Sequence, residues 1–193
     1  MRIIAGQAHG RRLKAPRGLA TRPTSARARE SIFSRLSVRM DFAAIRVLDI
    51  FAGSGSLGIE SLSRGAGHVT FVDSARAAAS VIRQNLKSLG FQDSGRILVL
   101  EVRRALAEVA AAGETFDLAF VDAPYKNDIS AEVVVTLARL ELIERDGWVV
   151  VEQSKRAPAL PPSPGGLERI NIATLGDHRI AFYRRPSMAP SES

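Results

Sequence analysis

The sequence contains no cysteine and few aromatic residues, and these absences exclude several classes of protein at once. Of its 193 residues, none is cysteine, one is tryptophan and two are tyrosine. Without cysteine the chain has no disulfide, no thiolate zinc site and no cysteine nucleophile. Its three histidines, His9, His68 and His178, are far apart in the sequence, so we expect no metal site.

Long hydrophobic runs are also missing. No segment approaches the ~18 consecutive apolar residues that a membrane-spanning helix needs. The apolar patch within MRIIAGQAHGRRLK is too short for the core of a signal peptide. We therefore expect a cytoplasmic protein with no membrane partner. Hydrophobic residues still make up 46% of the chain, enough for the core of one domain, and because no apolar stripe is left over we expect a monomer.

Acidic residues are nearly absent from the first 39 residues. This segment has ten lysines and arginines against one acid, Glu30, which gives it a net charge of +9, whereas the whole chain has +7. A basic segment on a nearly neutral body is typical of a protein that binds a polyanion. The alternative is a solvated surface that binds nothing. A membrane surface is a poorer partner because the segment lacks bulky apolar residues at helical spacing.

Short apolar runs alternate with helical stretches through the middle of the chain. Five runs have the composition of buried strands, namely 45–51, 68–73, 95–101, 116–122 and 147–153. The segments between them have helical periodicity and end in glycine, namely 56–65, 75–90, 103–113 and 130–147. This alternation predicts an α/β fold with a parallel sheet covered on both faces.

Both ends of the chain depart from this alternation. Residues 167–185 follow a proline-rich loop and predict an antiparallel hairpin that turns at Gly176 and Asp177. At the front, we expect residues 1–16 to form a small hairpin and residues 24–36 a helix capped by Thr24 or Ser25. Residues 186–193 have the composition of a disordered tail.

The stretch VLDIFAGSGSLG contains the spacing G-x-G-x-x-G in Gly53, Gly55 and Gly58. Gly53 permits a tight turn, and Gly55 lets a ligand approach the backbone closely. Asp73 ends the next strand, where a carboxylate can accept hydrogen bonds from ribose hydroxyls. A nicotinamide dinucleotide and other adenosine ligands fit these features equally.

Asp49 separates these ligands. A carboxylate near the end of the first strand repels a pyrophosphate, which needs backbone N–H groups at a helix N-terminus. It suits a ligand with a positive charge, such as the amino group and sulfonium of S-adenosylmethionine. The alternative is a structural role, in which Asp49 caps the loop that follows it.

The stretch VDAPY ends the fourth predicted strand, on the carboxyl edge where open α/β sheets bind their ligands. Pro124 biases Ala123 toward an extended conformation, which directs the Asp122 carboxylate and a backbone carbonyl the same way, with Tyr125 beside them. Two acceptors and an aromatic face fit a planar amino group. The alternative is an ordinary turn at the end of a strand.

Together these segments resemble the amino-methyltransferases and, more narrowly, the ribosomal small-subunit methyltransferase D family. The resemblance rests on MRIIAGQAHGRRLKAP, RPTSARARESIF, LDIFAGSGSLGIESLSRGA, DAPY and GDHRIAFY, and covers Met1 to about Tyr183. It implies a Rossmann-like class I methyltransferase fold with a mostly parallel seven-stranded sheet that ends in the C-terminal antiparallel hairpin. It also implies that S-adenosylmethionine is the cofactor and that the methyl acceptor is N2 of a guanine in bacterial 16S ribosomal RNA, naked or in an assembling small subunit.

The resemblance divides the chain and assigns roles to its residues. Residues 1–39 become a basic arm that faces RNA, residues 40–185 the methyltransferase domain and residues 186–193 the tail. The cofactor residues implied are Asp49, Ala52, Gly53, Ser54 and Gly55 at the methionine end and Asp73 at the ribose. Those implied at the target base are Asp122, Ala123, Pro124 and Tyr125. The expected RNA-facing residues are Arg2, Arg11, Arg12, Lys14, Arg22, Thr24, Arg27 and Glu30.

Two positions depart from the family pattern. Ala123 replaces the first proline of the family's loop, which leaves its carbonyl as an acceptor, so we expect activity to survive. The segment LEVRRAL lacks a clear Asp or Asn for the adenine amino group, so Glu101 is the candidate there, with backbone atoms as the alternative.

In this hypothesis, Asp122 and the Ala123 carbonyl hold the guanine amino group with its lone pair toward the sulfonium methyl, and Tyr125 stacks on the base. The base must then be unpaired or flipped out. Within the same chemistry, the target could instead be adenine N6 or a protein glutamine. From other classes, a nicotinamide oxidoreductase is disfavoured by Asp49 and by the lack of a Tyr-x-x-x-Lys motif, and a non-catalytic RNA-binding module remains open.

Overall fold

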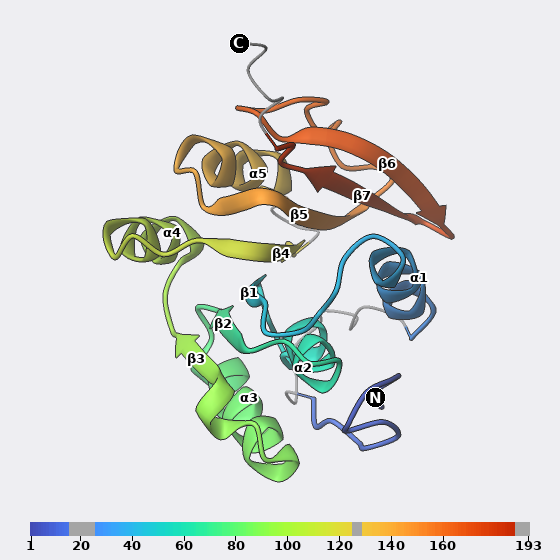
Figure 1. Ribbon diagram of the computed structural model, residues 1–193, viewed down its shortest axis with the longest axis vertical. Helices are drawn as coiled ribbons and strands as arrows, with labels where there is room; N and C mark the ends of the chain where they lie inside the picture. The colour runs from blue at the N-terminus through green and yellow to red at the C-terminus, as the bar shows by residue number, and fades with distance from the viewer. Residues whose placement is uncertain (16–25, 125–128, 188–193) are drawn as a thin grey trace.

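Strands and helices alternate along the chain, as the sequence pattern predicts. The computed structural model describes residues 1–15, 26–124 and 129–187. In these residues the elements are α1 (Ala26–Ser37), β1 (Arg46–Ile50), α2 (Ser56–Ser63), β2 (His68–Val72), α3 (Arg76–Leu89), the 3₁₀ turn η1 (Gln92–Ser94), β3 (Gly95–Leu98), α4 (Val102–Ala111), β4 (Phe116–Asp122), α5 (Ser130–Arg139), β5 (Ile143–Ser154), β6 (Glu168–Leu175) and β7 (His178–Arg184). Figure 1 shows them around one sheet.

The strands form a seven-stranded sheet in the order β3-β2-β1-β4-β5-β7-β6. Strands β1 to β5 pair in parallel, while β7 is antiparallel to both β5 and β6. The predicted fold class, with its C-terminal hairpin, is confirmed. The strand order reverses between β1 and β4, and open α/β sheets bind ligands beside the carboxyl ends of the strands at such a point.

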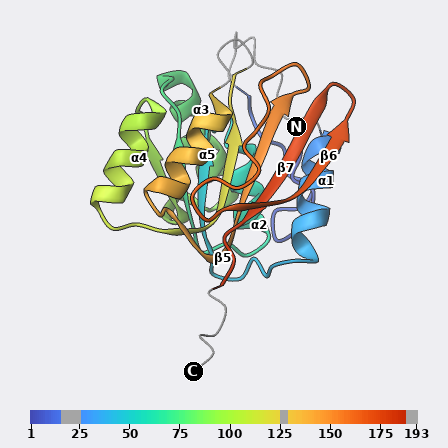
Figure 2. The ribbon, with the colours of Figure 1, turned by 90° about the horizontal axis from the view of Figure 1, so that it is seen from above.

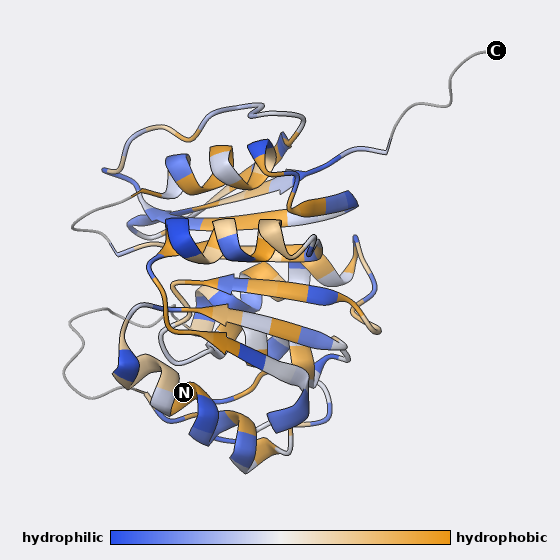
Figure 3. Ribbon diagram, turned by 90° about the vertical axis from the view of Figure 1, so that its left-hand side faces the viewer, coloured by the Kyte–Doolittle hydropathy of each residue, from blue (hydrophilic) through white to orange (hydrophobic). Residues whose placement is uncertain are grey.

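Two clusters of buried apolar side chains cover the two faces of the sheet. One joins α1, α2 and α3 to the sheet and includes Phe33 and Ile82; the other joins α4 and α5 to the opposite face and includes Leu106 and Leu137. Figures 1 and 2 show α4 and α5 side by side, across the sheet from α1 and α2. In Figure 3 the strands between the helices are largely hydrophobic, as a sheet covered on both faces requires.

One predicted helix is too long. The periodicity predicts a helix over 130–147, but α5 ends at Arg139 and β5 begins at Ile143. Ile143 pairs with Phe116, and the Phe116 N–H donates to the Leu142 carbonyl at 2.9 Å. The neighbouring β4 therefore captures a segment whose own spacing fits a helix, because pairing satisfies backbone groups that burial would otherwise leave unpaired.

The first fifteen residues pack against the domain. A single antiparallel bridge joins Arg2 to Arg12, as a small hairpin requires. Ile3, Ala8 and Leu13 are buried in the same cluster as α1 and α2. The expected helical cap at Thr24 or Ser25 lies outside the described residues. The division of the chain into an arm, a domain and a tail stays a prediction.

A buried carboxylate attaches this N-terminal segment to α2. Glu60 is fully buried and accepts the N–H groups of Ile4, at 2.8 Å, and Ala5, at 3.0 Å. It also pairs with Arg64 at 2.9 Å and lies 4.0 Å from the guanidinium of Arg29, which is 1% exposed. Burial lowers the pKa of Arg29 while the Glu60 charge opposes that change, so Glu60 is the main counter-charge for a buried cation.

Among the described residues, none of the helices has the length and apolar content needed to cross a bilayer.

Replacing Glu60 by Ala should lower the free energy of unfolding by roughly 3–5 kcal/mol, because Arg29 then remains buried without its counter-charge. Urea titrations followed by fluorescence of Trp148, the only tryptophan, would measure the loss. The matched control is Glu168→Ala, since Glu168 is an exposed side chain on β6 and should change stability by less than about 0.5 kcal/mol. Equal losses in the two variants would contradict the role given to Glu60.

Candidate functional site

Acidic side chains line the carboxyl edge of the sheet on a single face. Asp49 of β1 pairs with Phe71 of β2 and Phe120 of β4. Asp122 lies two residues beyond Phe120, at the end of β4, and Asp73 lies two residues beyond Phe71, directly after β2, so both follow the alternation that puts them on that face. We call Asp49, Asp73 and Asp122 the carboxylate row. It flanks the point where the strand order reverses.

Asp49 is buried deepest in this row. Its side chain is 2% exposed, and its Oδ2 accepts the N–H of Gly58 at 2.9 Å. Burial raises its pKa to about 8, the Gly58 hydrogen bond acts in the opposite direction, and the nearby charges of Asp122 and Asp73 raise the pKa further. The structural role considered for Asp49 is therefore real, and the same carboxylate is also a group that a neighbouring cation would ionise.

The loop between β1 and α2 is held in an unusual backbone conformation. Phe51, Gly53 and Gly55 have φ angles of 62°, 56° and 75°. For glycine this region is accessible, but for a bulky residue such as Phe51 it costs about 1–3 kcal/mol. The Gly55 N–H closes the turn by donating to the Ala52 carbonyl at 2.7 Å. The turn thus directs backbone groups of residues 52–55 over the end of β1.

Gly58 allows α2 to approach the sheet. A Cβ at this position would lie 2.4 Å from a ring carbon of Phe71 and 2.7 Å from a methyl of Val69. No side chain fits there without displacing the side chains of Phe71 and Val69 on β2. The third glycine of the motif therefore brings the Gly58 N–H within reach of Asp49.

Asp73 organises the same loop from the neighbouring strand. Its Oδ2 accepts the Gly53 N–H and its Oδ1 accepts the Ala75 N–H, each at 2.8 Å. Each carboxylate oxygen has a further lone pair, so these bonds leave room for a hydroxyl donor. Asp73 is only partly exposed, at the edge where the loop turns.

Ser54 is fixed by residues that are distant in sequence. Its carbonyl accepts a hydrogen bond from Nδ2 of Asn85 on α3 at 3.0 Å. Asn85 also binds both main-chain groups of Lys14, accepting its N–H at 2.9 Å and donating to its carbonyl at 3.0 Å. One buried amide therefore connects the glycine loop with the N-terminal segment.

The segment after β4 is described only in part. Asp122 ends β4 and is partly exposed, Ala123 is 2% exposed, and Pro124 is exposed. Tyr125 lies outside the described residues. Asp122 is thus placed beside Asp49 by the register of β1 and β4, as expected, while the stacking role of Tyr125 stays a prediction.

Sequence reasoning missed Glu152. This residue of β5 is the register partner of Asp122, is 3% exposed, and lies 3.1 Å from Nδ1 of His178. It extends the row of acids by one strand. The available signal was the same as for Asp73 and Asp122, an acid that follows a run of apolar residues at the carboxyl end of a buried strand.

Glu101 has a structural partner. It is the N-cap of α4, and its Oε2 accepts the Arg103 N–H at 2.9 Å. Its side chain is exposed beyond the end of β3. The predicted contact with adenine remains a prediction.

The expected RNA-facing residues differ in how far they can be placed. Arg2, Arg11, Arg12 and Lys14 are exposed on the N-terminal segment, Arg27 and Glu30 are exposed on α1, and Arg22 and Thr24 lie outside the described residues. Arg29, which contributes to the basic count of the first 39 residues, is buried. The charge available to a partner is therefore smaller than the composition indicates.

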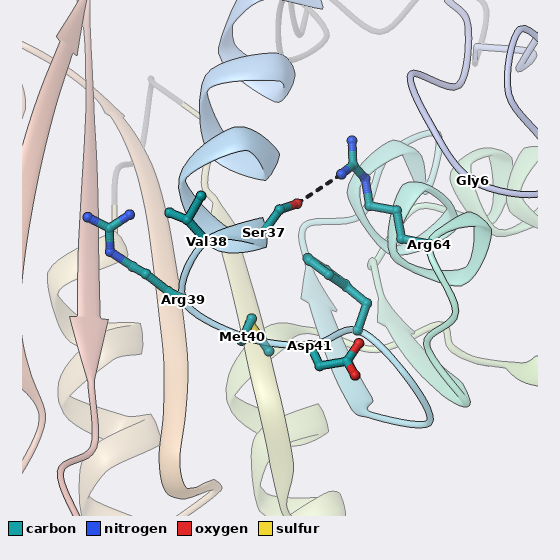
Figure 4. A pocket seen from close by; sticks show the side chains of 8 residues that line it. Gly6, Ser37, Val38, Arg39, Met40, Asp41 and Arg64 are labelled. Atoms are coloured by element: carbon teal, nitrogen blue, oxygen red, sulfur yellow. Dashed lines mark hydrogen bonds between the residues drawn. The ribbon is translucent and has the colours of Figure 1, made fainter.

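One surface hollow lies away from this site. It has a volume of about 720 Å³ and is lined by Gly6, Ser37, Val38, Arg39, Met40, Asp41, Phe42 and Arg64. It precedes β1 and β2, at the opposite ends of the strands from the glycine loop. In Figure 4 the Arg64 side chain is directed at Ser37, whose hydroxyl accepts its hydrogen bond at 3.1 Å. Among the described residues, no group of His, Asp and Glu side chains could hold a metal ion.

The sheet order, the glycine loop and the carboxylate row define a Rossmann-like class I methyltransferase. The chain belongs to the family described as Conserved hypothetical protein 95, whose model matches residues 1–184.

Named relatives support this assignment over nearly the whole chain. Ribosomal RNA small subunit methyltransferase D of Escherichia coli (strain K12) is 31% identical over 100% of this chain and 94% of its own. A Bacillus subtilis (strain 168) protein named "Putative rRNA methyltransferase YlbH" is 36% identical over 96% of this chain and 99% of its own. The solved structure of a hypothetical protein from Thermus thermophilus, TTHA0928, has a TM-score of 0.81 and 30% identity, over 94% of this chain and 98% of that one. The resemblance to the methyltransferase D family is confirmed.

The raised pKa of Asp49 predicts a pH dependence of stability. In the folded chain the carboxyl keeps its proton up to about pH 8, whereas in the unfolded chain it loses it near pH 4. Between these values the folded state binds more protons, so the free energy of unfolding falls as the pH rises.

The variant Asp49→Asn keeps an oxygen for the Gly58 N–H and removes this titration. Urea unfolding is measured without cofactor at pH 5, 6 and 7. The free energy of unfolding of the variant, relative to that of the wild type, should rise by about 1.4 kcal/mol for each pH unit. Other groups titrate equally in both proteins and cancel in the difference. A difference that does not change with pH would show that Asp49 is ionised in the folded chain.

Proposed function

We propose that this protein transfers a methyl group from S-adenosylmethionine to N2 of a guanine in 16S ribosomal RNA. The observation that carries the proposal is the carboxylate row beneath the glycine loop, with Asp49 almost wholly buried in it. The named relatives supply the substrate class, since they are called ribosomal RNA methyltransferases.

The charge of the row selects the kind of cofactor. Three carboxylates near one point favour a ligand that has positive charges, and the amino group and sulfonium of S-adenosylmethionine are such charges. A cation beside Asp49 would offset the desolvation that raises its pKa, so binding would ionise it. A dinucleotide would instead place its pyrophosphate against the same carboxylates, which argues against a nicotinamide oxidoreductase.

The cofactor's two ends would meet different parts of the site. Asp49 and backbone groups of residues 52–55 would hold the methionine end, and the spare lone pairs of Asp73 would accept the ribose hydroxyls. Glu101 is proposed for the adenine amino group. S-adenosylmethionine supplies the methyl group on a positively charged sulfur.

The target amine would be held at the end of β4. Asp122 and the Ala123 carbonyl would each accept one N–H of the guanine amino group, which turns the nitrogen lone pair toward the methyl. The transfer is then an in-line displacement that depends on positioning: a C–N bond forms, the S–C bond breaks, and the nitrogen releases one proton. Tyr125 is proposed as the surface on which the base stacks.

The remaining assignments follow from the substrate. The exposed basic residues of the N-terminal segment would contact phosphates, and the modified base would leave its stack to reach the row. A ribosomal substrate also implies a cytoplasmic enzyme, and we propose that it acts as a monomer.

The decisive experiment uses isotope-labelled S-adenosylmethionine and small ribosomal subunits from a strain that lacks the native modification. After reaction the RNA is digested to nucleosides. Label in N2-methylguanosine supports the proposal, whereas label in N6-methyladenosine keeps the cofactor and overturns the base. Label recovered in protein would identify a protein side chain as the target, and no label with cofactor bound would overturn the proposed substrate.

Asp122→Ala should reduce methyl transfer by roughly a hundredfold or more while the affinity for S-adenosylmethionine stays within about threefold. Transfer is measured with the labelled subunits and affinity by calorimetry. The control Asp41→Ala removes an exposed carboxylate at the opposite ends of the strands and should leave both quantities unchanged. Normal turnover by the Asp122 variant would exclude its role as an acceptor.

Replacing Arg11 and Arg12 together by Ala should weaken the binding of 16S rRNA. Because each phosphate contact adds about 0.7–0.9 to the slope of log K against log salt concentration, the slope should fall by up to about 1.8. Fluorescence anisotropy between 50 and 200 mM potassium chloride, roughly the range over which such slopes are read, would measure it. An equal loss of cofactor affinity would count against a separate RNA-binding role for these residues.

A further inference from the structure

The outer side of α3 has a row of cations without acids. Arg76, Arg83 and Lys87 are all exposed, and α3 contains no Asp or Glu. They are seven and eleven residues apart along the helix, which are close to whole numbers of 3.6-residue turns, so they lie on one side. We call these three residues the α3 stripe. Figure 3 shows α3 along the lower edge of the molecule, with much of its outer side hydrophilic.

The α3 stripe is not neutralised by neighbouring acids. Some exposed arginines elsewhere in the described residues form ion pairs, such as Arg96 with Glu114, Arg103 with Glu132 and Arg184 with Asp146. No ion pair or hydrogen bond of the stripe side chains appears among the described residues. Surface cations that repel one another and lack acids are the footprint of a polyanion site.

The α3 stripe continues the exposed basic surface of the N-terminal segment. Lys14 Nζ donates to Gln84 at 2.9 Å, and Arg11 donates to the Ser88 carbonyl at 2.8 Å, both on α3. Asn85 holds the main chain of Lys14 from the buried side of the same helix. These contacts bring the N-terminal segment against α3, and the two lie close together in Figure 1.

A groove accompanies the α3 stripe at its C-terminal end. It has a volume of about 690 Å³ and is lined by Arg83, Leu86, Lys87, Gly90, Gln92, Gly95 and Ile97. Its apolar side chains come from α3 and from β3, the edge strand of the sheet. Asp93 is the acid next to it, 3.5 Å from the Gln92 amide. The Arg83 guanidinium offers a plane on which an unpaired base can stack, the Gln92 amide can hydrogen-bond the edge of the base, and Lys87 can bind its phosphate.

We propose that the α3 stripe and this groove form a second RNA contact, in which Arg76, Arg83 and Lys87 bind phosphates and the groove takes an unpaired base. The inference rests on the proposed function for the identity of the polyanion. Arg76 begins α3 just after Asp73, so the stripe starts near the carboxylate row and extends about 16 Å along the helix. A strand whose target base has entered the row can therefore follow α3 across the side of the domain.

The test compares two double variants that remove equal charge. Arg83→Gln with Lys87→Gln alters the α3 stripe. Arg104→Gln with Arg139→Gln is the matched control, because these arginines are exposed on α4 and α5, which cover the opposite face of the sheet. The affinity of each protein for labelled 16S rRNA is measured by anisotropy as a function of salt. Neither variant touches the carboxylate row, and cofactor affinity should be unchanged in both.

The stripe variant should lose about 1.4–1.8 in the salt slope, the amount expected for two phosphate contacts, and the control less than half of that. Equal slopes in the two variants would overturn the proposal. Loss of binding to small subunits with an unchanged slope on naked 16S rRNA would also overturn it, and would identify an acidic protein of the subunit as the partner.

The groove is tested separately with 16S rRNA that contains 4-thiouridine. Irradiation followed by peptide mapping should give crosslinks within residues 83–97, and crosslinks confined to the N-terminal segment and α1 would exclude a base in the groove. Both measurements read binding rather than methylation. If no guanine is methylated but the salt slope of the stripe variant still falls, the RNA contact is supported and the proposed reaction fails. If guanine is methylated but the slope does not fall, the proposed reaction is supported and the RNA contact at α3 fails.

Discussion

The Asp49 carboxylate, buried at the carboxyl end of β1, is the group on which the geometry of the site depends. The hydrogen bond that Asp49 accepts from Gly58 fixes the first turn of α2. The helix comes this close to the sheet because Gly58 has no side chain to contact Phe71 and Val69. The turn of residues 51–55 is then closed above it and held from β2 by Asp73. An isolated carboxylate in such a place is costly and takes up a proton, so the site is built to accept a positive charge.

The N-terminal segment is part of this construction as well as a basic surface. Glu60 fixes its start to α2, and Asn85 fixes Lys14 to α3 while holding the Ser54 carbonyl. Both side chains are buried and bonded to backbone groups, so water competes poorly for these hydrogen bonds. Movement of the basic segment would break bonds to the same amide that positions the glycine loop, which links the two binding surfaces through one side chain.

Local patterns, each contained in a single segment of the sequence, predicted the fold and singled out the three residues of the carboxylate row. Asp73 and Asp122 each end an apolar run, and period and composition identify such runs as parallel strands. Glu152 has the same local signal, but its importance comes from its register with Asp122, which no single segment encodes. The predicted helix over 130–147 was wrong at its end for a related reason. Pairing of Ile143 with Phe116 starts β5 there, although the spacing of the apolar residues fits a helix. Glu60 and Asn85 act through partners more than fifty residues away.

The arrangement of charge limits how RNA can enter. The chain is basic overall, at +7, yet the carboxylate row is acidic, and the partly exposed Asp73 and Asp122 would repel the phosphates that the outer surface attracts. In the proposed function, phosphates would therefore stay on the exposed cations of the N-terminal segment and the α3 stripe, and only an uncharged base would approach Asp122. Charge alone would then require the target base to turn out of the RNA strand, away from the phosphates, and the same row that repels phosphate would attract the cationic methyl donor. In the proposed function, the charge of each partner would therefore direct RNA phosphates to the outer surface and the methyl donor to the carboxylate row, before any contact specific to guanine is made.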